Sequence, residues 1–167
     1  IINDVSGLTA DPEMAGVCAA SGCGIVVMHM QGTPAHMQNS PTYSDVVQDI
    51  RSYFAERFET LTRLGIAPAR LCFDPGIGFG KTLPHNLALL RELPNLAPDS
   101  LPLLLGVSRK SFLAKITSAE SHERDAPTIA LTALSRSQGI MLHRVHDVKG
   151  NLAALRATEA VITSFGL

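Results

Sequence analysis

The residues best suited to chemistry lie in five polar clusters, each of which follows a short aliphatic run. The clusters are Asn3-Asp4, His29-Met30-Gln31, Asp74, Ser108-Arg109-Lys110-Ser111 and Arg144-Val145-His146-Asp147. An aspartate can accept two parallel hydrogen bonds from an amidine-like N–C–N edge, an asparagine can both donate and accept, and a lysine can donate to a ring carbonyl. These functional groups together match a 2-amino-4-oxo-pyrimidine ring.

Arg144 and His146 form a candidate anion site. They are two residues apart in a predicted strand, so both side chains project from one face and could hold a phosphate. His143 and Val145 would face the other way. A surface ion pair of Arg144 with Asp147, and a packed, hydrogen-bonded His146, are the alternatives that these residues leave open.

A glycine-rich segment runs from Asp74 to Thr82 and suggests a loop that approaches a ligand closely. It is not a nucleotide-binding P-loop, because Pro75 stands where that motif needs glycine, and a G-x-G-x-x-G pattern fails at Lys81. The alternating glycines allow close backbone approach, and Phe79 offers a stacking face for a flat aromatic ligand. A plain turn capped by Asp74 is the alternative.

The elements that must position these clusters alternate between strand and helix. Strands are expected at Ile1-Ile2, 25–27, 70–73, 101–107 and 139–145, and helices at 11–22, 44–64, 83–93, 126–138 and 147–164. We expect Asp11 and Pro12 to open the first helix and Gly22 to close it. Such alternation requires crossover connections and a parallel sheet, so the predicted class is α/β.

Two architectures fit this alternation, the open doubly wound sheet and the closed (β/α)8 TIM-type barrel. Five units in 167 residues take roughly 33 residues each, so eight would need about 260, close to the ~250 typical of the barrel. The barrel is favoured because all five strand ends are polar and would converge on one rim. Leu103, Leu105, Ile140 and Leu142 are expected on its inner face.

The chain is therefore predicted to be the last five βα units of an incomplete barrel, a single domain over residues 1–167. It opens with Ile1 rather than Met, and two residues before Asn3 are too few for a typical strand of ~5–6 residues. We expect the isolated polypeptide to expose open sheet edges, to associate and to be inactive.

Composition excludes several other classes of protein. Fourteen Lys and Arg against fifteen Asp and Glu give a net charge of -1, so no basic field attracts nucleic acid or a membrane surface. No apolar run approaches the ~18 residues of a membrane helix. An odd set of cysteines, Cys18, Cys23 and Cys72, indicates a cytoplasmic location. His29 and His36 lack a helical i+3 or i+4 partner, which argues against a structural zinc site.

Five motifs, in order along the chain, resemble dihydropteroate synthase. They are Ile2-Asn3-Asp4-Val5-Ser6-Gly7, Met28-His29-Met30-Gln31-Gly32-Thr33-Pro34 with Met37-Gln38, Asp74-Pro75-Gly76-Ile77-Gly78-Phe79-Gly80-Lys81 with His85-Asn86, Gly106-Val107-Ser108-Arg109-Lys110-Ser111-Phe112-Leu113, and Arg144-Val145-His146-Asp147-Val148. The resemblance implies a pterin-binding (β/α)8 barrel that joins p-aminobenzoate to 6-hydroxymethyl-7,8-dihydropterin pyrophosphate in folate synthesis, releasing pyrophosphate. Sulfonamides compete for the aminobenzoate site of this family.

The resemblance also implies roles for individual residues. The pterin would be bound by Asn3, Met28, Asp74 and Lys110, and the aminobenzoate by Gly78, Phe79, Lys110 and Ser111. Arg144 and His146 would hold the pyrophosphate and, with Lys110, are the expected catalytic residues. The family uses Mg²⁺, whose protein ligand is expected on earlier strands that this chain lacks, so no metal ligand is predicted among its residues.

Two alternatives to a synthase are kept. A pterin-dependent methyltransferase binds a related ring but has no use for the anion site, so Arg144 and His146 argue against it. A non-catalytic pterin-binding fragment or paralogue would keep the rim without the remaining strands. The expected partners are small-molecule substrates, sulfonamide inhibitors and, for the full-length protein, a second copy in a homodimer.

Overall fold

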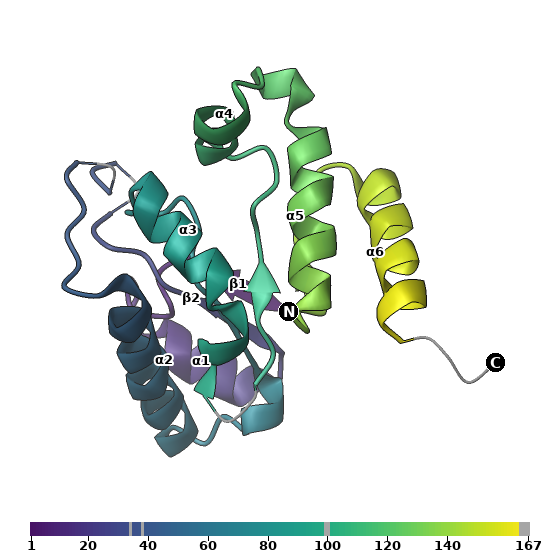
Figure 1. Ribbon diagram of the computed structural model, residues 1–167. Helices are drawn as coiled ribbons and strands as arrows, with labels where there is room; N and C mark the ends of the chain where they lie inside the picture. The colour runs from purple at the N-terminus through teal and green to yellow at the C-terminus, as the bar shows by residue number, and fades with distance from the viewer. Residues whose placement is uncertain (34, 38, 99–100, 164–167) are drawn as a thin grey trace.

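The computed structural model describes residues 1–33, 35–37, 39–98 and 101–163 and shows alternating strands and helices (Figure 1). The elements in chain order are β1 (Ile2–Asp4), α1 (Met14–Ser21), β2 (Ile25–Met28), α2 (Val46–Arg63), β3 (Leu71–Asp74), α3 (Leu83–Arg91), β4 (Leu104–Leu105), α4 (Ser111–Thr117), α5 (Asp125–Ser137), β5 (Leu142–His143) and α6 (Val148–Ile162). Short 3₁₀ turns cover Pro68–Arg70, Leu93–Asn95 and Ser121–Glu123.

The strands pair in parallel and in chain order. One sheet contains β1, β2 and β3, and the other contains β4 and β5. A bridge between Phe73 and Leu103 and a 2.9 Å hydrogen bond from the Phe73 N–H to the Pro102 carbonyl join the two sheets. Among the described residues β1 and β5 each pair on one side only. The arrangement confirms the α/β class and is an open arc of parallel units, as an incomplete barrel requires.

The parallel register divides the strand residues between two faces. Neighbours in register lie on the same face, so one face carries Asn3, Val26, Met28, Cys72 and Asp74. We call this the inner face. The opposite face packs into the hydrophobic core against the helices through Ile25, Val27, Leu71 and Phe73. Burial of such aliphatic side chains stabilises the fold by about 1.5–3 kcal/mol each.

Three of the four residues that the sequence predicted on the inner face do not lie there. Leu103, Leu105 and Ile140 are buried in the core beneath the helices. Only Leu142, which pairs with Leu104, lies on the inner face. The alternation of a strand has a period of two, so an error of one residue in phase exchanges the two faces.

The last two strands are shorter than predicted. The run 101–107 contributes only Leu104–Leu105, and the run 139–145 contributes only Leu142–His143, although Arg144 N–H still bonds the Leu105 carbonyl at 3.0 Å. Pro102 has no N–H to donate to a ladder, which limits the pairing at that end. The predicted strand 70–73 also differs, because Arg70 belongs to the 3₁₀ turn before β3 and the strand begins at Leu71.

The first helix begins later than expected, whereas the longest helix is as predicted. Glu13 rather than Asp11 precedes α1, and the Asp11 carboxylate instead accepts the Glu13 N–H at 2.9 Å in a local turn. Gly22 ends α1 in the left-handed region, as expected. In α2, Asp45 caps the amino end by accepting two backbone N–H groups, and Val46, Ile50, Phe54 and Leu61 of the apolar stripe are buried.

Candidate functional site

The carboxyl ends of the strands bring together the predicted charged residues. Asp74 ends β3 on the inner face, in register with Met28 of β2. Gly106 follows β4, and a Cβ placed there would lie 3.9 Å from Asp74 Oδ2 and 4.0 Å from Arg144 Cβ. A carboxylate and a guanidinium-bearing residue from β3 and β5 thus flank the same backbone position at one end of the arc.

Asp74 is a buried carboxylate with several cations around it. It is 6% exposed, and its Oδ1 accepts the Gly76 N–H at 2.7 Å. Burial raises the pKa of Asp74, while the Gly76 hydrogen bond and the charges of Lys110, Lys81 and Arg144 oppose that rise. The carboxylate is therefore fixed in orientation and faces an electropositive surrounding.

Lys110 lies between Asp74 and the glycine-rich loop. Its Nζ donates to the Ile77 carbonyl and stands 4.6 Å from the centroid of the Phe79 ring, a cation–π arrangement. Its stem passes Gly78 so closely that a Cβ there would be 3.1 Å from Lys110 Cδ. Burial lowers the pKa of Lys110 to about 8, although Asp74 opposes this shift.

Arg109, the neighbour of Lys110, takes no part in this cluster. Its guanidinium makes two bonds to the Asp125 carboxylate, at 2.8 and 2.7 Å. The Arg109 backbone has φ +56°, which turns consecutive side chains in different directions. The ion pair lies at the start of α5, so Arg109 is a surface residue that fixes the loop.

Arg144 and His146 both lie exposed beyond β5. Buried Ser108 holds His146, because its Oγ accepts the His146 N–H at 3.1 Å and lies 2.8 Å from His146 Nδ1. Asp147 caps α6 by accepting the Gly150 N–H at 3.1 Å. The ion pairs between described residues do not include Arg144, so the alternative pair with Asp147 is wrong.

The other predicted ligand-binding residues lie around this cluster. Asn3, in β1, is exposed on the inner face, and Ser111 is exposed at the first position of α4. Phe79 is half-buried beside Lys110, and the Gly78 N–H donates to Asn86 Oδ1 at 2.7 Å. The structure therefore places these residues at or near the carboxyl ends of the strands, with Asn3 in the middle of β1, and their roles stay predictions.

The glycines of the loop are required by close backbone contacts. Gly76 has φ +62°, and a Cβ on it would collide with the carbonyl oxygen of His29. Gly80 has φ +60°, and a Cβ there would lie 2.5 Å from the Gln31 carbonyl oxygen. Asp74 does cap the turn, by accepting the Gly76 N–H at 2.7 Å, as the alternative reading expected. The loop after β3 also packs directly on the segment after β2, which a turn alone does not require.

Sequence reasoning gave no role to Lys81, His29 or Asn86. Lys81 is only 3% exposed, and its Nζ lies 3.1 Å from His29 Nδ1. Asn86 is buried and spans from the Gly78 N–H to the Thr82 carbonyl, which its Nδ2 reaches at 2.9 Å. All three residues lie within the motifs that resemble the family, but nothing in the sequence shows that they are buried together.

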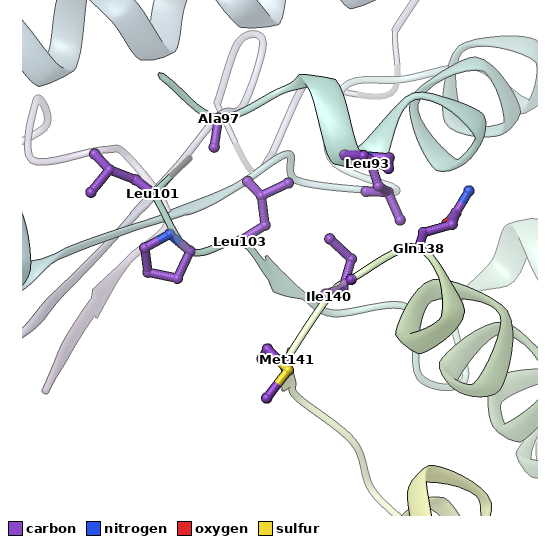
Figure 2. Close-up of a pocket in the computed structure, with 10 residues that line it drawn as sticks. Leu93, Ala97, Leu101, Leu103, Gln138, Ile140 and Met141 are labelled. Atoms are coloured by element: carbon purple, nitrogen blue, oxygen red, sulfur yellow. The ribbon is translucent and has the colours of Figure 1, made fainter. Parts of the chain in front are cut away.

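A cavity of about 330 Å³ lies at the other end of the strands and does not belong to this site. The residues that line it include Leu93, Leu103, Ile140 and Met141, with Gln138 at its edge (Figure 2). These residues lie before or near the amino ends of β4 and β5. Ligands of parallel barrels bind at the carboxyl ends, so the charged cluster is the better candidate.

The described residues contain neither a metal-binding cluster nor a membrane-spanning helix. No group of three or more His, Cys, Asp or Glu side chains is arranged to hold a metal ion there. No helix of that part is both long and apolar enough to cross a bilayer. Cys18, Cys23 and Cys72 are free thiols.

Comparison with known proteins identifies the relatives of this chain. The family described as "Pterin binding enzyme" matches residues 1–146. The chain is 39% identical over 164 residues to dihydropteroate synthase of Escherichia coli K12, covering 98% of this chain and 58% of that protein. It spans well under two thirds of that relative.

Solved structures give the same result. A Yersinia pestis dihydropteroate synthase in complex with a sulfonamide drug superposes with a TM-score of 0.93 at 38% identity, over 97% of this chain and 59% of that one. A Xanthomonas albilineans dihydropteroate synthase with 4-aminobenzoic acid gives 0.90 at 36% identity, over 98% and 58%.

An arc of parallel βα units with a buried carboxylate and several cations at its carboxyl rim defines part of an α/β barrel. The family match makes this specific, and the chain belongs to the family of pterin-binding enzymes. Within that family, the relatives that it resembles are dihydropteroate synthases, which are TIM-barrel enzymes. The resemblance seen in the five motifs is thereby confirmed.

Proposed function

We propose that the intact protein, meaning these 167 residues in whatever polypeptide carries them, is a dihydropteroate synthase. It would join p-aminobenzoate to 6-hydroxymethyl-7,8-dihydropterin pyrophosphate and release pyrophosphate in folate synthesis. The observation that carries this proposal is the convergence of Asp74, Lys110 and Arg144 at one rim in a member of the pterin-binding family. An acceptor for the ring and cations for the leaving group are both needed by this reaction.

Asp74 is proposed to accept two parallel hydrogen bonds from the N–C–N edge of the pterin. Its carboxylate is buried and held by the Gly76 N–H, so it is oriented before the ring arrives. Lys110 would donate to the ring carbonyl, Met28 would line the slot and Asn3 would donate and accept at the ring edge. Register places Met28 beside Asp74, which supports this arrangement.

The aminobenzoate is proposed to lie on the other side of Lys110. Gly78 and Phe79 would border its ring, and Ser111 at the start of α4 would contact its carboxylate. The 4.6 Å separation of the Lys110 ammonium from the Phe79 ring supports a shared wall between the two substrates. The relatives solved with a sulfonamide drug and with 4-aminobenzoic acid support aminobenzoate and sulfonamide binding.

The chemical step is a substitution at the methylene carbon of the pterin. The amine nitrogen of p-aminobenzoate forms a C–N bond, the C–O bond to pyrophosphate breaks with its electron pair leaving on oxygen, and the amine releases one proton. Arg144 and His146 would hold the β-phosphate as this negative charge accumulates. Ser108 supports that role for His146 because it fixes the imidazole at the rim.

Mg²⁺, the cofactor implied by the resemblance, stays a prediction. Mg²⁺ commonly binds through substrate phosphates and waters with only one or two protein ligands, and no residue of this chain is assigned to it. Magnesium bound to pyrophosphate would neutralise the leaving charge.

The proposal includes location and assembly. The free thiols of all three cysteines support a reducing compartment and thus the cytoplasm. A homodimer of the intact protein is proposed from the resemblance. No nucleic acid or membrane partner is proposed, because the net charge is only -1.

A pyrophosphate-release assay tests the function. The intact protein should release pyrophosphate from the pterin substrate only when p-aminobenzoate is present, and a sulfonamide should compete with p-aminobenzoate. Pterin binding without release would instead indicate the non-catalytic pterin-binding paralogue. Methyl transfer from a methylated pterin, without pyrophosphate release, would indicate the methyltransferase.

A further inference from the structure

Lys81 has an unusual environment for a lysine. Its ammonium group has three protons, and three acceptors surround it: His29 Nδ1 at 3.1 Å, the Gly76 carbonyl at 3.1 Å and the Phe79 carbonyl at 3.0 Å. The His29 carbonyl lies further away, at 3.4 Å. The ion pairs between described residues do not include Lys81, so its charge is buried without a bonded carboxylate.

These contacts join the two segments that form the pterin slot. Gly76 and Phe79 belong to the loop that follows Asp74, whereas His29 follows Met28 at the end of β2. An ammonium can only donate hydrogen bonds, so His29 Nδ1 must accept from Lys81 and the His29 ring must be neutral. Burial and the charge of Lys81 lower the pKa of His29 to about 3, which is consistent with a neutral ring.

Lys81 also acts on Asp74 through charge. It is one of three cations whose charge opposes the rise in the pKa of Asp74, and, unlike Lys110 and Arg144, it lies beneath the loop. Burial lowers the pKa of Lys81 to about 7, and Asp74 opposes that shift. The two buried groups therefore favour each other's charged forms.

We propose that Lys81 is a positioning residue for pterin recognition, which ties the loop 74–80 to the end of β2 and places a positive charge near the Asp74 carboxylate that receives the ring. This inference rests on the proposed pterin-binding role of Asp74. Lys81 would not touch the substrate, because the loop backbone that it binds lies between them.

Several elements contribute titratable groups that face Asp74, His29 and the loop above Lys81. Asp74 is faced by Lys110 before α4, Arg144 after β5 and the Cys72 thiol of β3. Around His29 and the loop stand Tyr53 of α2, whose ring centroid is 4.8 Å from that of His29, and Tyr43, whose hydroxyl donates to the Gly80 carbonyl, with His85 against Tyr43. The variants below leave all of these unchanged.

The test uses Lys81→Met in the intact protein, with Lys115→Met, an exposed lysine of α4, as the matched control. Isothermal titration with pteroic acid is run from pH 4.5 to 8.5. Lys81→Met is expected to weaken binding at least tenfold at pH 7. The acid limb of its affinity profile should lie at higher pH than in the wild type, because Asp74 has lost a nearby cation. Lys115→Met should match the wild type.

A double-variant cycle separates positioning from a structural role. Adding Asp74→Asn to Lys81→Met should cost much less affinity than Asp74→Asn costs in the wild type, since Lys81 acts through that carboxylate. Normal affinity and an unmoved acid limb in folded Lys81→Met would overturn the proposal. If Lys81→Met does not fold, Lys81→Gln, which keeps donors but removes the charge, should show the same shift in the acid limb. Unfolding of both variants would show a structural role and overturn it as well.

A failure of the proposed pterin-binding function would give a different result from a failure of the Lys81 positioning role. If the wild type and Lys115→Met both fail to bind pteroic acid, the pterin-binding role of Asp74 is refuted. If both bind and Lys81→Met is unchanged, only the positioning role is refuted.

Discussion

Replacing Asp74 by asparagine tests the pterin site most directly. The two side chains have nearly the same shape, and asparagine keeps one oxygen to accept the Gly76 N–H, which is 2.7 Å from the carboxylate now. The second oxygen becomes an NH₂ group, which cannot accept from the N–C–N edge of the ring. The side chain is only 6% exposed, so water cannot replace the lost partner.

The expected loss is on the order of 2–5 kcal/mol, as for one partner removed from a buried, charge-assisted pair. This corresponds to a roughly 30-fold to several-thousand-fold rise in Kd.

The measurement is isothermal titration of the intact protein with pteroic acid at neutral pH, with the melting temperature recorded for each variant. Glu56→Gln, the same carboxylate-to-amide change on the exposed face of α2, should bind as the wild type does. If Asp74→Asn keeps its affinity within a factor of three, Asp74 does not recognise the pterin and the geometric reasoning is refuted.

Four further outcomes follow from the same geometry. Lys110→Ala should raise the KM for both substrates at least tenfold while Arg109→Ala changes them little, because Arg109 pairs with Asp125 at the exposed start of α5; equal small effects would place Lys110 outside the site. Ser108→Ala should lower kcat several-fold and leave pteroic acid affinity unchanged, since it releases His146 only; a change in pterin affinity instead would contradict the proposed division of roles. Burial lowers the folded-state pKa of His29 to about 3, so the wild type should lose up to about 1.4 kcal/mol of unfolding free energy per pH unit as pH falls from 6.5 toward 3. Denaturant titrations of His29→Gln should lack this contribution. If the unfolding free energy of both proteins changes equally with pH, the histidine is not held neutral. The isolated 167-residue polypeptide should elute as oligomers in light-scattering chromatography and show no synthase activity, because β1 and β5 present unpaired edges; an active, cooperatively melting monomer would disprove this.

The sequence predicts the class and the chemistry of this protein because both depend on local patterns. Alternating strand and helix signals led to a parallel α/β fold, and the polar residues at strand ends led to the rim. The α2 helix was predicted within two residues at each end, since its apolar stripe and the Asp45 cap are properties of a single segment. The five motifs indicated the family for the same reason.

Other features depended on packing between segments. A shift of one residue in the strand alternation moves Leu103 and Leu105 from one face of the sheet to the other, and the register with the neighbouring strands decides which face they occupy. The lengths of β4 and β5 were set by which N–H groups found a partner across the strands, and Pro102 has none to offer.

The tertiary structure also decided the environment of single side chains. Arg109 and Lys110 are adjacent and both cationic, yet one pairs with Asp125 at the surface and the other stands over Phe79 in the site. Lys81 reads in the sequence as part of a glycine-rich loop, and only the contact of that loop with His29 buries it. Burial and partners are properties of segments that are distant in the chain, and the pKa of a side chain follows from them rather than from its neighbours in sequence.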